Sequence, residues 1–387
     1  MKPKLIRITT IPISLEKLLG GQLRFMNDYF NVIAISSEDV KLKEVGVKEQ
    51  VATFHLEMTR KITPIKDCVA VLKLYFFLKK EKPSIVHTHT PKAGIIGMLA
   101  AKLAGVPCRL HTVAGLPLVE ATGVKRKILD FVERLTYACA TKVYPNSFGL
   151  LAIIKENKYC DLSKLKVLAN GSSNGIDTSY FNKKHFTESQ NLQLRTELGI
   201  DKIDFVFIFV GRIVADKGIN ELVAAFLELE KNNKNVKLLL VGPLEEDLNP
   251  LKSEILKEIQ TNSAIVSVGY KNDVRPYFSI SDCLVFPSYR EGFPNVVMQA
   301  GAMELPSIVS DINGCNEIII NQENGIIIPV KNQQALYGSM NEMLLNSDLY
   351  LDLKKNSRNR IVSNYEQTVV WKSILEEYNH FIDLNLK

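Results

Sequence analysis

The chain has 387 residues, of which 46% are hydrophobic and 23% charged, a composition typical of a globular protein with two domains. The net charge of +6 suits anionic small molecules or an anionic membrane surface, and is too low to indicate nucleic acid. No signal-peptide pattern opens the chain, and the longest apolar stretch, residues 93–106, is too short to cross a bilayer. The six cysteines form no C-x-x-C pair, so neither a disulfide framework nor a zinc site is expected. These features favour a cytoplasmic protein that at most touches the inner face of the cell membrane.

Short apolar runs alternate with amphipathic stretches along the first half of the chain. This alternation favours right-handed βαβ units and a mostly parallel sheet. The Gly-, Ser- and Asn-rich residues 170–184 break the pattern and indicate a linker. The predicted strands are residues 5–9, 31–35, 51–55, 85–88, 109–113, 142–144 and 166–168, and the predicted helices include 65–80, 93–104 and 125–140.

The same alternation begins again after the linker. It predicts the strands 205–210, 237–241, 265–268, 283–286, 307–310 and 325–328, and the helices 219–229, 251–261, 295–303 and 333–345. The predicted fold class is α/β, with two Rossmann-like doubly wound domains facing a central cleft. The predicted boundaries are a domain of residues 1–170, a linker of residues 171–190, a domain of residues 191–364 and a C-terminal helix of residues 365–387, packing back on the first domain.

The strongest motif, F-V-G-R-I-V-A-D-K-G, follows the predicted strand 205–210. Gly211 allows the backbone to turn tightly, Arg212 projects from the strand edge, and Lys217 lies where the next helix begins. Two cations beside a helix N-terminus favour binding of a diphosphate. The alternative is an ordinary surface arginine and lysine in a loop.

A second motif, P-S-Y-R-E-G-F-P-N-V-V-M-Q-A, follows the predicted strand 283–286. Glu291 in its loop can accept hydrogen bonds from sugar hydroxyls, and the backbone N–H groups of Gly292 and Phe293 can reach the same ligand. Pro294 is a suitable residue to begin the helix. The alternative reading is that Glu291 only caps that helix.

Together, G-R-x(4)-K-G and E-G-F-P-x(4)-Q-A resemble the "glycosyltransferases group 1" family of retaining GT-B enzymes, over nearly the whole chain. The resemblance implies that Arg212 and Lys217 hold the donor diphosphate and that Glu291 contacts the transferred sugar, so these three are the expected catalytic residues. The implied donor-binding set is Gly211, Arg212, Lys217, Glu291, Gly292, Phe293, Pro294, Asn295 and Gln299. Gln299 replaces the second acid of the family's E-x(7)-E motif; it can still hydrogen-bond to ribose hydroxyls, without the charge.

The resemblance also implies a cleft in the first domain, which would bind the acceptor, while the second domain binds the nucleotide sugar. The expected residues of this cleft are Gly20, Gly21, His89, Ala114 and Gly115. Many family members carry a histidine where this chain has Ala114, and His111 is interpreted as a structural residue inside its strand. His87 and His89 are expected to point to opposite faces, one of them toward the cleft.

The resemblance favours a UDP-sugar as donor of a hexose or N-acetylhexosamine. The implied acceptor is a saccharide, carried on a polyprenyl diphosphate, in the synthesis of surface polysaccharide such as capsule or lipopolysaccharide. No D-x-D pair occurs, so neither a metal nor a cofactor is expected. Lys125, Arg126 and Lys127 stand beside apolar residues in segment 122–134, which is either a peripheral membrane contact or a solvated helix with an ordinary core side.

Other classes of protein remain as alternatives. A non-catalytic sugar-nucleotide-binding subunit stays open because Ala114 and Gln299 depart from the family pattern. A sugar-nucleotide epimerase shares the architecture but lacks the paired motifs. A dinucleotide oxidoreductase is disfavoured because no G-x-G-x-x-G follows the first strand.

Overall fold

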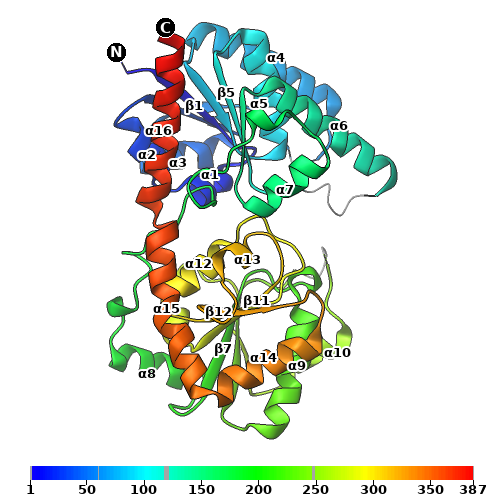
Figure 1. The fold of residues 1–387 in the computed structure, drawn as a ribbon, viewed down its shortest axis with the longest axis vertical. Coiled ribbons are helices and arrows are strands. Elements are labelled where there is room, and N and C mark those ends of the chain that lie inside the picture. Colours follow the sequence, from blue (N-terminus) through cyan, green and yellow to red (C-terminus); the bar gives the residue numbers. More distant parts are fainter. Residues whose placement is uncertain (1, 60, 117–121, 246–248, 387) are drawn as a thin grey trace. The chain divides into compact units, whose positions relative to one another are not determined.

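The computed structural model describes residues 2–59, 61–116, 122–245 and 249–386, and the chain divides into two compact units (Figure 1). Unit 1 comprises Met1–Gly175 together with Gln367–Lys387, and unit 2 comprises Ile176–Glu366. Each unit contains one six-stranded sheet, and every strand pairing in both sheets is parallel. The prediction of two doubly wound α/β domains is confirmed.

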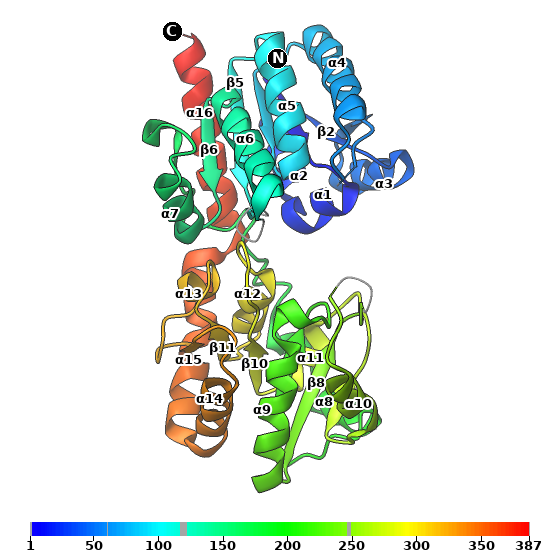
Figure 2. The same cartoon turned by 90° about the vertical axis from the view of Figure 1, so that its right-hand side faces the viewer.

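Unit 1 follows the order β3-β2-β1-β4-β5-β6 in its sheet. Its strands are β1 (Lys4–Ile8), β2 (Asn31–Ser36), β3 (Ala52–His55), β4 (Ile85–Thr88), β5 (Cys108–Val113) and β6 (Lys142–Pro145). Its helices are α1 (Pro12–Leu19), α2 (Gln22–Asn27), α3 (Asp39–Glu49), α4 (Pro64–Glu81), α5 (Pro91–Ala104), α6 (Gly123–Cys139), α7 (Phe148–Glu156) and α16 (Gln367–Leu386). The helices α4 to α6 cover one face of the sheet, while α1 to α3 and α16 cover the other (Figures 1 and 2).

The centre of this sheet contains buried polar side chains, which the pattern of apolar residues in the sequence does not predict. Arg7 on β1 and His87 on β4 are direct neighbours across the sheet, and both are fully buried. Arg7 donates to Tyr378 Oη of α16 at 2.9 Å and to Gln22 Oε1 of α2 at 2.5 Å. Burial of a charge requires hydrogen-bond partners of this kind. The network therefore joins α16 and α2 to the middle of the sheet.

Three buried histidines make unit 1 sensitive to acid. Burial lowers the pKa of His111 to about 4, and also lowers the pKa of His87 and His89 well below their ordinary value. An unfolded chain binds protons at these positions near pH 6.5, whereas the folded chain does not, so acidification between pH 6.5 and 4 favours unfolding. Over this interval the protonation of His111 alone lowers the free energy of unfolding by roughly 3 kcal/mol. Buried Glu133, whose pKa is raised to about 7, acts in the opposite direction between pH 4.5 and 7.

We expect that His111→Asn flattens the dependence of the unfolding free energy on pH between 6.5 and 4. Urea unfolding at a series of pH values measures it. The exposed His55→Asn is the control and should keep the slope of the parent protein. Equal slopes for the His111 variant and the parent would show that His111 does not stay neutral in the folded chain.

Unit 2 follows the order β12-β11-β10-β7-β8-β9 in its sheet. Its strands are β7 (Phe205–Val210), β8 (Val236–Val241), β9 (Ile265–Ser267), β10 (Cys283–Phe286), β11 (Ser307–Ser310) and β12 (Gly325–Ile328). Its helices are α8 (Glu188–Glu197), α9 (Ile219–Asn232), α10 (Ser253–Thr261), α11 (Arg275–Ser279), α12 (Asn295–Ala302), α13 (Cys315–Ile318), α14 (Gln333–Leu345) and α15 (Ser347–Tyr365). The strand order reverses between β7 and β10, so the loops after these two strands diverge at a topological switch point.

Two local predictions were wrong. Residues 166–168 do not form a strand, because only an isolated bridge between Leu165 and Val143 extends the sheet past β6. The predicted C-terminal helix started too early, since Tyr365 ends α15 and α16 begins at Gln367.

Candidate active site

The loops of both predicted donor motifs lie at the switch point of unit 2. The first forms the loop after β7 and the short turn η4 (Ala215–Lys217), and the second forms the loop after β10. β7 and β10 are paired, with Cys283 opposite Phe207 and Leu284 opposite Ile208. The backbone N–H of Tyr289 donates to the carbonyl of Asp216 at 3.0 Å and ties the two loops together. Motifs far apart in the sequence thus form one site at the carboxyl edge of the sheet.

Lys217 and Glu291 meet directly in this site. Lys217 Nζ donates to Glu291 Oε1, and Ser288 Oγ donates to the same carboxylate oxygen at 3.0 Å. The two charged side chains are only 17% and 18% exposed, so water screens the pair weakly. Pro294 is the N-cap of α12, and no side chain caps that helix. The alternative that Glu291 is a helix cap is therefore wrong.

A glycine explains how Lys217 reaches this position. Gly218 has a φ of 73°, and a Cβ atom there would lie 2.2 Å from the carbonyl oxygen of Pro287 in the loop after β10. Only glycine fits such a conformation and such a close approach without strain. Gly218 in the first motif therefore allows η4 to pack closely against the loop of the second motif.

Arg212 occupies the neighbouring loop and pairs with Glu245, which follows β8. Its Nη1 donates to Glu245 Oε2 at 3.0 Å, and the two side chains are 42% and 31% exposed. The loops after β7 and β8 approach closely, because a Cβ on Gly242 would lie 1.8 Å from the carbonyl oxygen of Gly211. Both predicted cations thus have a carboxylate partner.

We expect Glu245→Gln to strengthen binding of UDP by up to about fivefold. The substitution removes a carboxylate that would compete with a phosphate for Arg212, and an ion pair this exposed contributes at most about 1 kcal/mol. Titration calorimetry with UDP measures the change. Weaker binding by the variant would mean that Glu245 supports the donor site and does not compete with the donor.

The remaining residues of the second motif are arranged around the start of α12. Phe293 is nearly buried, and its ring packs on Tyr365 with centroids 5.5 Å apart, so only its backbone is available to a ligand. A Cβ on Gly314 would lie 2.7 Å from the carbonyl oxygen of Gly292, which places the 314–316 loop beside this motif. Asn295 begins α12 and Gln299 lies on it, both half-buried.

In unit 1, Gly21 has a packing role. A Cβ at this position would lie 2.8 Å from the ring of Trp371 in α16, and the Gly21 N–H donates to Glu49 Oε1 at 2.9 Å. The contact with Trp371 and a φ of 76° account for this glycine without a ligand. Ala114 and Gly115 follow β5 and are half-buried, and residues 117–121 lie outside the described residues.

The expectation that His87 and His89 point to opposite faces was wrong. Residues two apart on a strand share a face, and the two imidazole rings lie 4.2 Å apart. Arg7 Nε donates to His89 Nε2 at 3.1 Å, so the His89 proton must lie on Nδ1. No partner for Nδ1 occurs among the residues that the structure describes. His111 lies inside β5 and bonds to Thr88 Oγ1 at 2.7 Å, which confirms its structural interpretation.

Sequence reasoning missed four residues that shape the candidate donor site. Ser288 stands three positions before Glu291 in the same motif, and Gly218 ends the first motif, so both could have been assigned a role from the sequence. Gly242 directly follows the apolar run of β8, which is a signal for a turn at a strand end. Glu245 carries no such signal, because nothing in its spacing relates it to Arg212.

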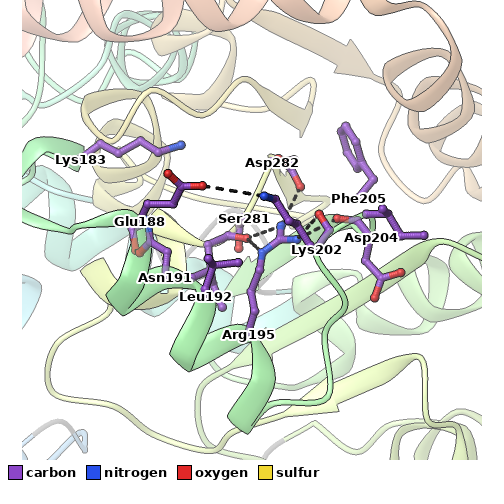
Figure 3. A pocket seen from close by; sticks show the side chains of 13 residues that line it. Lys183, Glu188, Asn191, Leu192, Arg195, Lys202, Asp204, Phe205, Ser281 and Asp282 are labelled. Atoms are coloured by element: carbon purple, nitrogen blue, oxygen red, sulfur yellow. Dashed lines mark hydrogen bonds and ion pairs between the residues drawn. The ribbon is translucent and has the colours of Figure 1, made fainter.

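A cavity of about 400 Å³ opens elsewhere in unit 2 (Figure 3). Asp204 and Asp282 in its wall precede β7 and β10, so it lies at the amino ends of these strands, away from the predicted donor site. Arg195 is the central cation of this cavity. It donates to the carbonyl oxygens of Ile280 and Asp204 and to the carboxylate of Asp282, so it serves to join local structure.

Among residues 2–59, 61–116, 122–245 and 249–386, no group of three or more His, Cys, Asp or Glu side chains is placed to hold a metal ion. No helix within these ranges is long and apolar enough to span a membrane.

Comparisons with known proteins agree with this architecture. Residues 190–360 match the family model "Glycosyl transferases group 1", and residues 35–171 match the model "Glycosyl transferase 4-like domain". The capsular polysaccharide biosynthesis glycosyltransferase CapM of Staphylococcus aureus is 31% identical over 380 residues, covering 98% of this chain and 97% of CapM. The Escherichia coli UDP-Gal:alpha-D-GlcNAc-diphosphoundecaprenol alpha-1,3-galactosyltransferase is 31% identical over 383 residues, covering 94% and 95%.

A solved structure shows the same fold at low sequence identity. The crystal structure of Anabaena HepE in complex with UDP superposes with a TM-score of 0.80 at 16% identity, covering 98% of this chain and 100% of HepE. The fold is therefore the GT-B fold of glycosyltransferases. Together with the match to CapM over nearly its full length, the family model shows that the chain belongs to the glycosyltransferases group 1 family.

Proposed function

We propose that this chain is a retaining glycosyltransferase that moves a hexose or N-acetylhexosamine from a UDP-sugar to a polyprenyl-diphosphate-linked saccharide. The observation that carries the proposal is the contact between Lys217 and Glu291 at the switch point of unit 2. It joins the two donor motifs in one site, with a cation for phosphate beside a carboxylate for sugar hydroxyls. The preference for UDP is supported by the HepE structure, which contains UDP, and by the E. coli relative, which is named for UDP-Gal.

A bound diphosphate would replace the carboxylates of Glu245 and Glu291 as partners of the two cations. Arg212 would leave Glu245 for one phosphate, and Lys217 would turn from Glu291 to the other. Glu291 would then be free to accept hydrogen bonds from the sugar. Gln299, on α12, would hydrogen-bond to the ribose. The backbone N–H groups near Gly292 and the start of α12 would face the same ligand.

In the proposed reaction the acceptor hydroxyl attacks the anomeric carbon from the side of the leaving phosphate. The bond between that carbon and the phosphate oxygen breaks, the new glycosidic bond forms, and the hydroxyl proton passes to the departing UDP. Negative charge grows on the diphosphate during this step, and fixed cations such as Arg212 and Lys217 stabilise it more strongly than water would. The mechanism requires no metal.

Unit 1 would bind the acceptor at the carboxyl edge of its sheet, where Gly20, Ala114 and Gly115 are the proposed contacts. The Nδ1–H of His89 has no partner among the described residues, but His89 is buried, so we propose no direct contact between this group and the acceptor. The E. coli relative is named for a diphosphoundecaprenol-linked acceptor, which supports this choice of acceptor class.

We also propose that segment 122–134 makes the peripheral membrane contact that such an acceptor needs, at the inner face of the cell membrane. Ile128 and Phe131 on α6 are exposed, as are Lys125 and Lys127. Arg126 instead pairs with Asp130 at 2.9 Å. An apolar face that lies outside the core and carries lysines suits the surface of an anionic bilayer.

The experiment that tests the proposal incubates the protein with radiolabelled UDP-sugars and a polyprenyl-diphosphate-linked saccharide in detergent. We expect label to pass to the lipid fraction with the anomeric configuration of the donor retained. The second candidate, a non-catalytic sugar-nucleotide-binding subunit, is favoured by Ala114 and Gln299 and predicts binding of UDP without transfer. Product of inverted configuration would also contradict the proposal.

A further inference from the structure

The outward side of α4 is apolar, which is unusual for a helix that covers a sheet. Ile65, Val69, Leu72 and Phe76 are 83%, 47%, 57% and 67% exposed. These positions are spaced by four, three and four residues, so they form one line along the helix, about 16 Å long. The residues that α4 buries are Ala70, Leu74 and Leu78, on the side toward the sheet. The exposed line is thus a second apolar face, without a partner among the described residues.

The charges beside this line have one sign. Lys66, Lys73, Lys79 and Lys80 of α4 are all exposed. The two acidic residues of α4 are already neutralised by lysines elsewhere: Asp67 pairs with Lys92 at 2.5 Å, and Glu81 pairs with Lys4 at 2.6 Å. The outward face of α4 therefore combines large apolar side chains with free positive charge.

A second helix on the same side of the sheet repeats this combination. On α6, Val124, Ile128 and Phe131 are exposed at spacings of four and three residues. Lys125 and Lys127 beside them are also exposed, whereas Arg134 donates to the carbonyl oxygens of Asn157 and Lys158. Buried Glu133 and Tyr137 lie toward the core. α5 packs between α4 and α6, and the three helices form one layer (Figure 2).

We propose that the outward face of α4 docks unit 1 on an anionic membrane surface, jointly with α6. This inference rests on the proposed function, because a lipid-linked acceptor requires the enzyme to work at a membrane. Apolar side chains of α4 would enter the region between head groups and acyl chains, while the lysines would contact anionic head groups. Contact through two helices of one layer would fix the orientation of unit 1 relative to the membrane. Contact through one helix alone would allow unit 1 to rotate about that helix.

The charge pattern argues against a second copy of the chain as the occupant. An exposed apolar line with this spacing could pair with another helix. In a pair of α4 helices, however, lysines would face lysines with no free acidic residue to offset them. Like charges so placed oppose association. An anionic surface supplies the missing negative charge.

Sedimentation with vesicles tests the proposal. The full chain should bind vesicles of phosphatidylcholine mixed with phosphatidylglycerol, and should bind pure phosphatidylcholine much more weakly. The double variant Leu72→Gln/Phe76→Gln should lower the partition coefficient at least about tenfold, because it removes two large apolar side chains from the contact. Lys66→Gln/Lys73→Gln should lower it by about fivefold per charge at low salt and by less at high salt.

The matched control is Leu345→Gln/Leu351→Gln, which replaces two leucines of unit 2 that are 65% and 57% exposed. It should bind vesicles as the parent does. Stabilisation by UDP, followed by thermal unfolding, should be equal in all these variants and shows that each is folded. This readout also separates the two proposals, since absence of UDP binding by the parent would reject the proposed function regardless of the vesicle result.

Two outcomes would overturn the inference. The first is wild-type vesicle binding by Leu72→Gln/Phe76→Gln, including the case in which Ile128→Gln/Phe131→Gln alone abolishes binding. The second is a dimer of the parent chain, measured by light scattering, that the α4 variant converts to a monomer without any change in vesicle binding.

Discussion

Replacing Glu291 by glutamine should lower the turnover number about a hundredfold without weakening the binding of UDP. The loss of one fixed electrostatic contact in an active site typically has an effect of this size on turnover. Glutamine keeps the shape and can still accept a hydrogen bond from Ser288, but it removes the charge beside Lys217 and the transferred sugar. Steady-state kinetics with the labelled donor measures turnover, and calorimetry measures UDP binding.

The matched control for this substitution is Glu221→Gln. Glu221 is another half-buried carboxylate near the motif, and it accepts the Tyr289 hydroxyl at 2.7 Å. An amide oxygen can replace that acceptor, so turnover should stay within about twofold of the parent. If Glu291→Gln turned over at the rate of the parent, Glu291 would have no role in the reaction.

Replacing Gly218 by alanine should destabilise unit 2 by about 3 kcal/mol or more. Alanine would have to adopt a left-handed conformation, and its Cβ would lie 2.2 Å from the Pro287 carbonyl oxygen, so the backbone must move. The movement would separate Lys217 from Glu291, and we expect UDP binding to weaken as well. Urea unfolding and UDP titration measure the two effects.

Gly199→Ala separates backbone strain from the close contact. Gly199 has a φ of 66°, and a Cβ there would meet nothing within 4 Å. This variant should therefore lose only about 1 kcal/mol and bind UDP normally. Equal losses in both variants would show that the approach of η4 to Pro287 contributes nothing.

Most strands of the two sheets could be predicted from the sequence because they are buried on both faces, although the edge strands β3 and β9 are not. Such strands are continuous apolar runs, as in F-V-F-I-F-V of β7, and their ends coincide with turn residues. The exception, residues 166–168, contains two apolar residues for a different reason. Leu168 packs into the cluster beneath α16 and pairs with no strand.

Some helices could not be predicted because their buried sides carry little apolar signal. The buried residues of α15 are Leu353, Ser357, Ile361 and Tyr365, and the rest of the helix is polar. A Cβ on Gly301 of α12 would lie 2.7 Å from the side chain of Ile361, so the interface of α12 with α15 requires a small residue at that point. Such a helix is determined by its packing against a partner helix, which lies outside the neighbouring stretch of sequence.

The candidate donor site was more predictable than the candidate acceptor site. Arg212, Lys217 and Glu291 each follow a recognisable strand, and parallel strands that neighbour each other bring their loops together. Glu245 was not predictable, because its pairing with Arg212 depends on the paths of two loops. In unit 1, the role of Gly21 depends on Trp371, which lies 350 residues later in the chain.

Thermal unfolding with UDP tests the central claim most directly, since the claim is that Arg212 and Lys217 hold the donor diphosphate. UDP at about a hundred times its dissociation constant should stabilise the parent by roughly 2.7 kcal/mol, which raises the midpoint of unit 2 by about 5–10 °C. UMP, which lacks the second phosphate, should give a smaller shift at the same concentration. Arg212→Ala should lose most of the UDP shift. A UDP shift of parental size in Arg212→Ala would contradict the proposed diphosphate site.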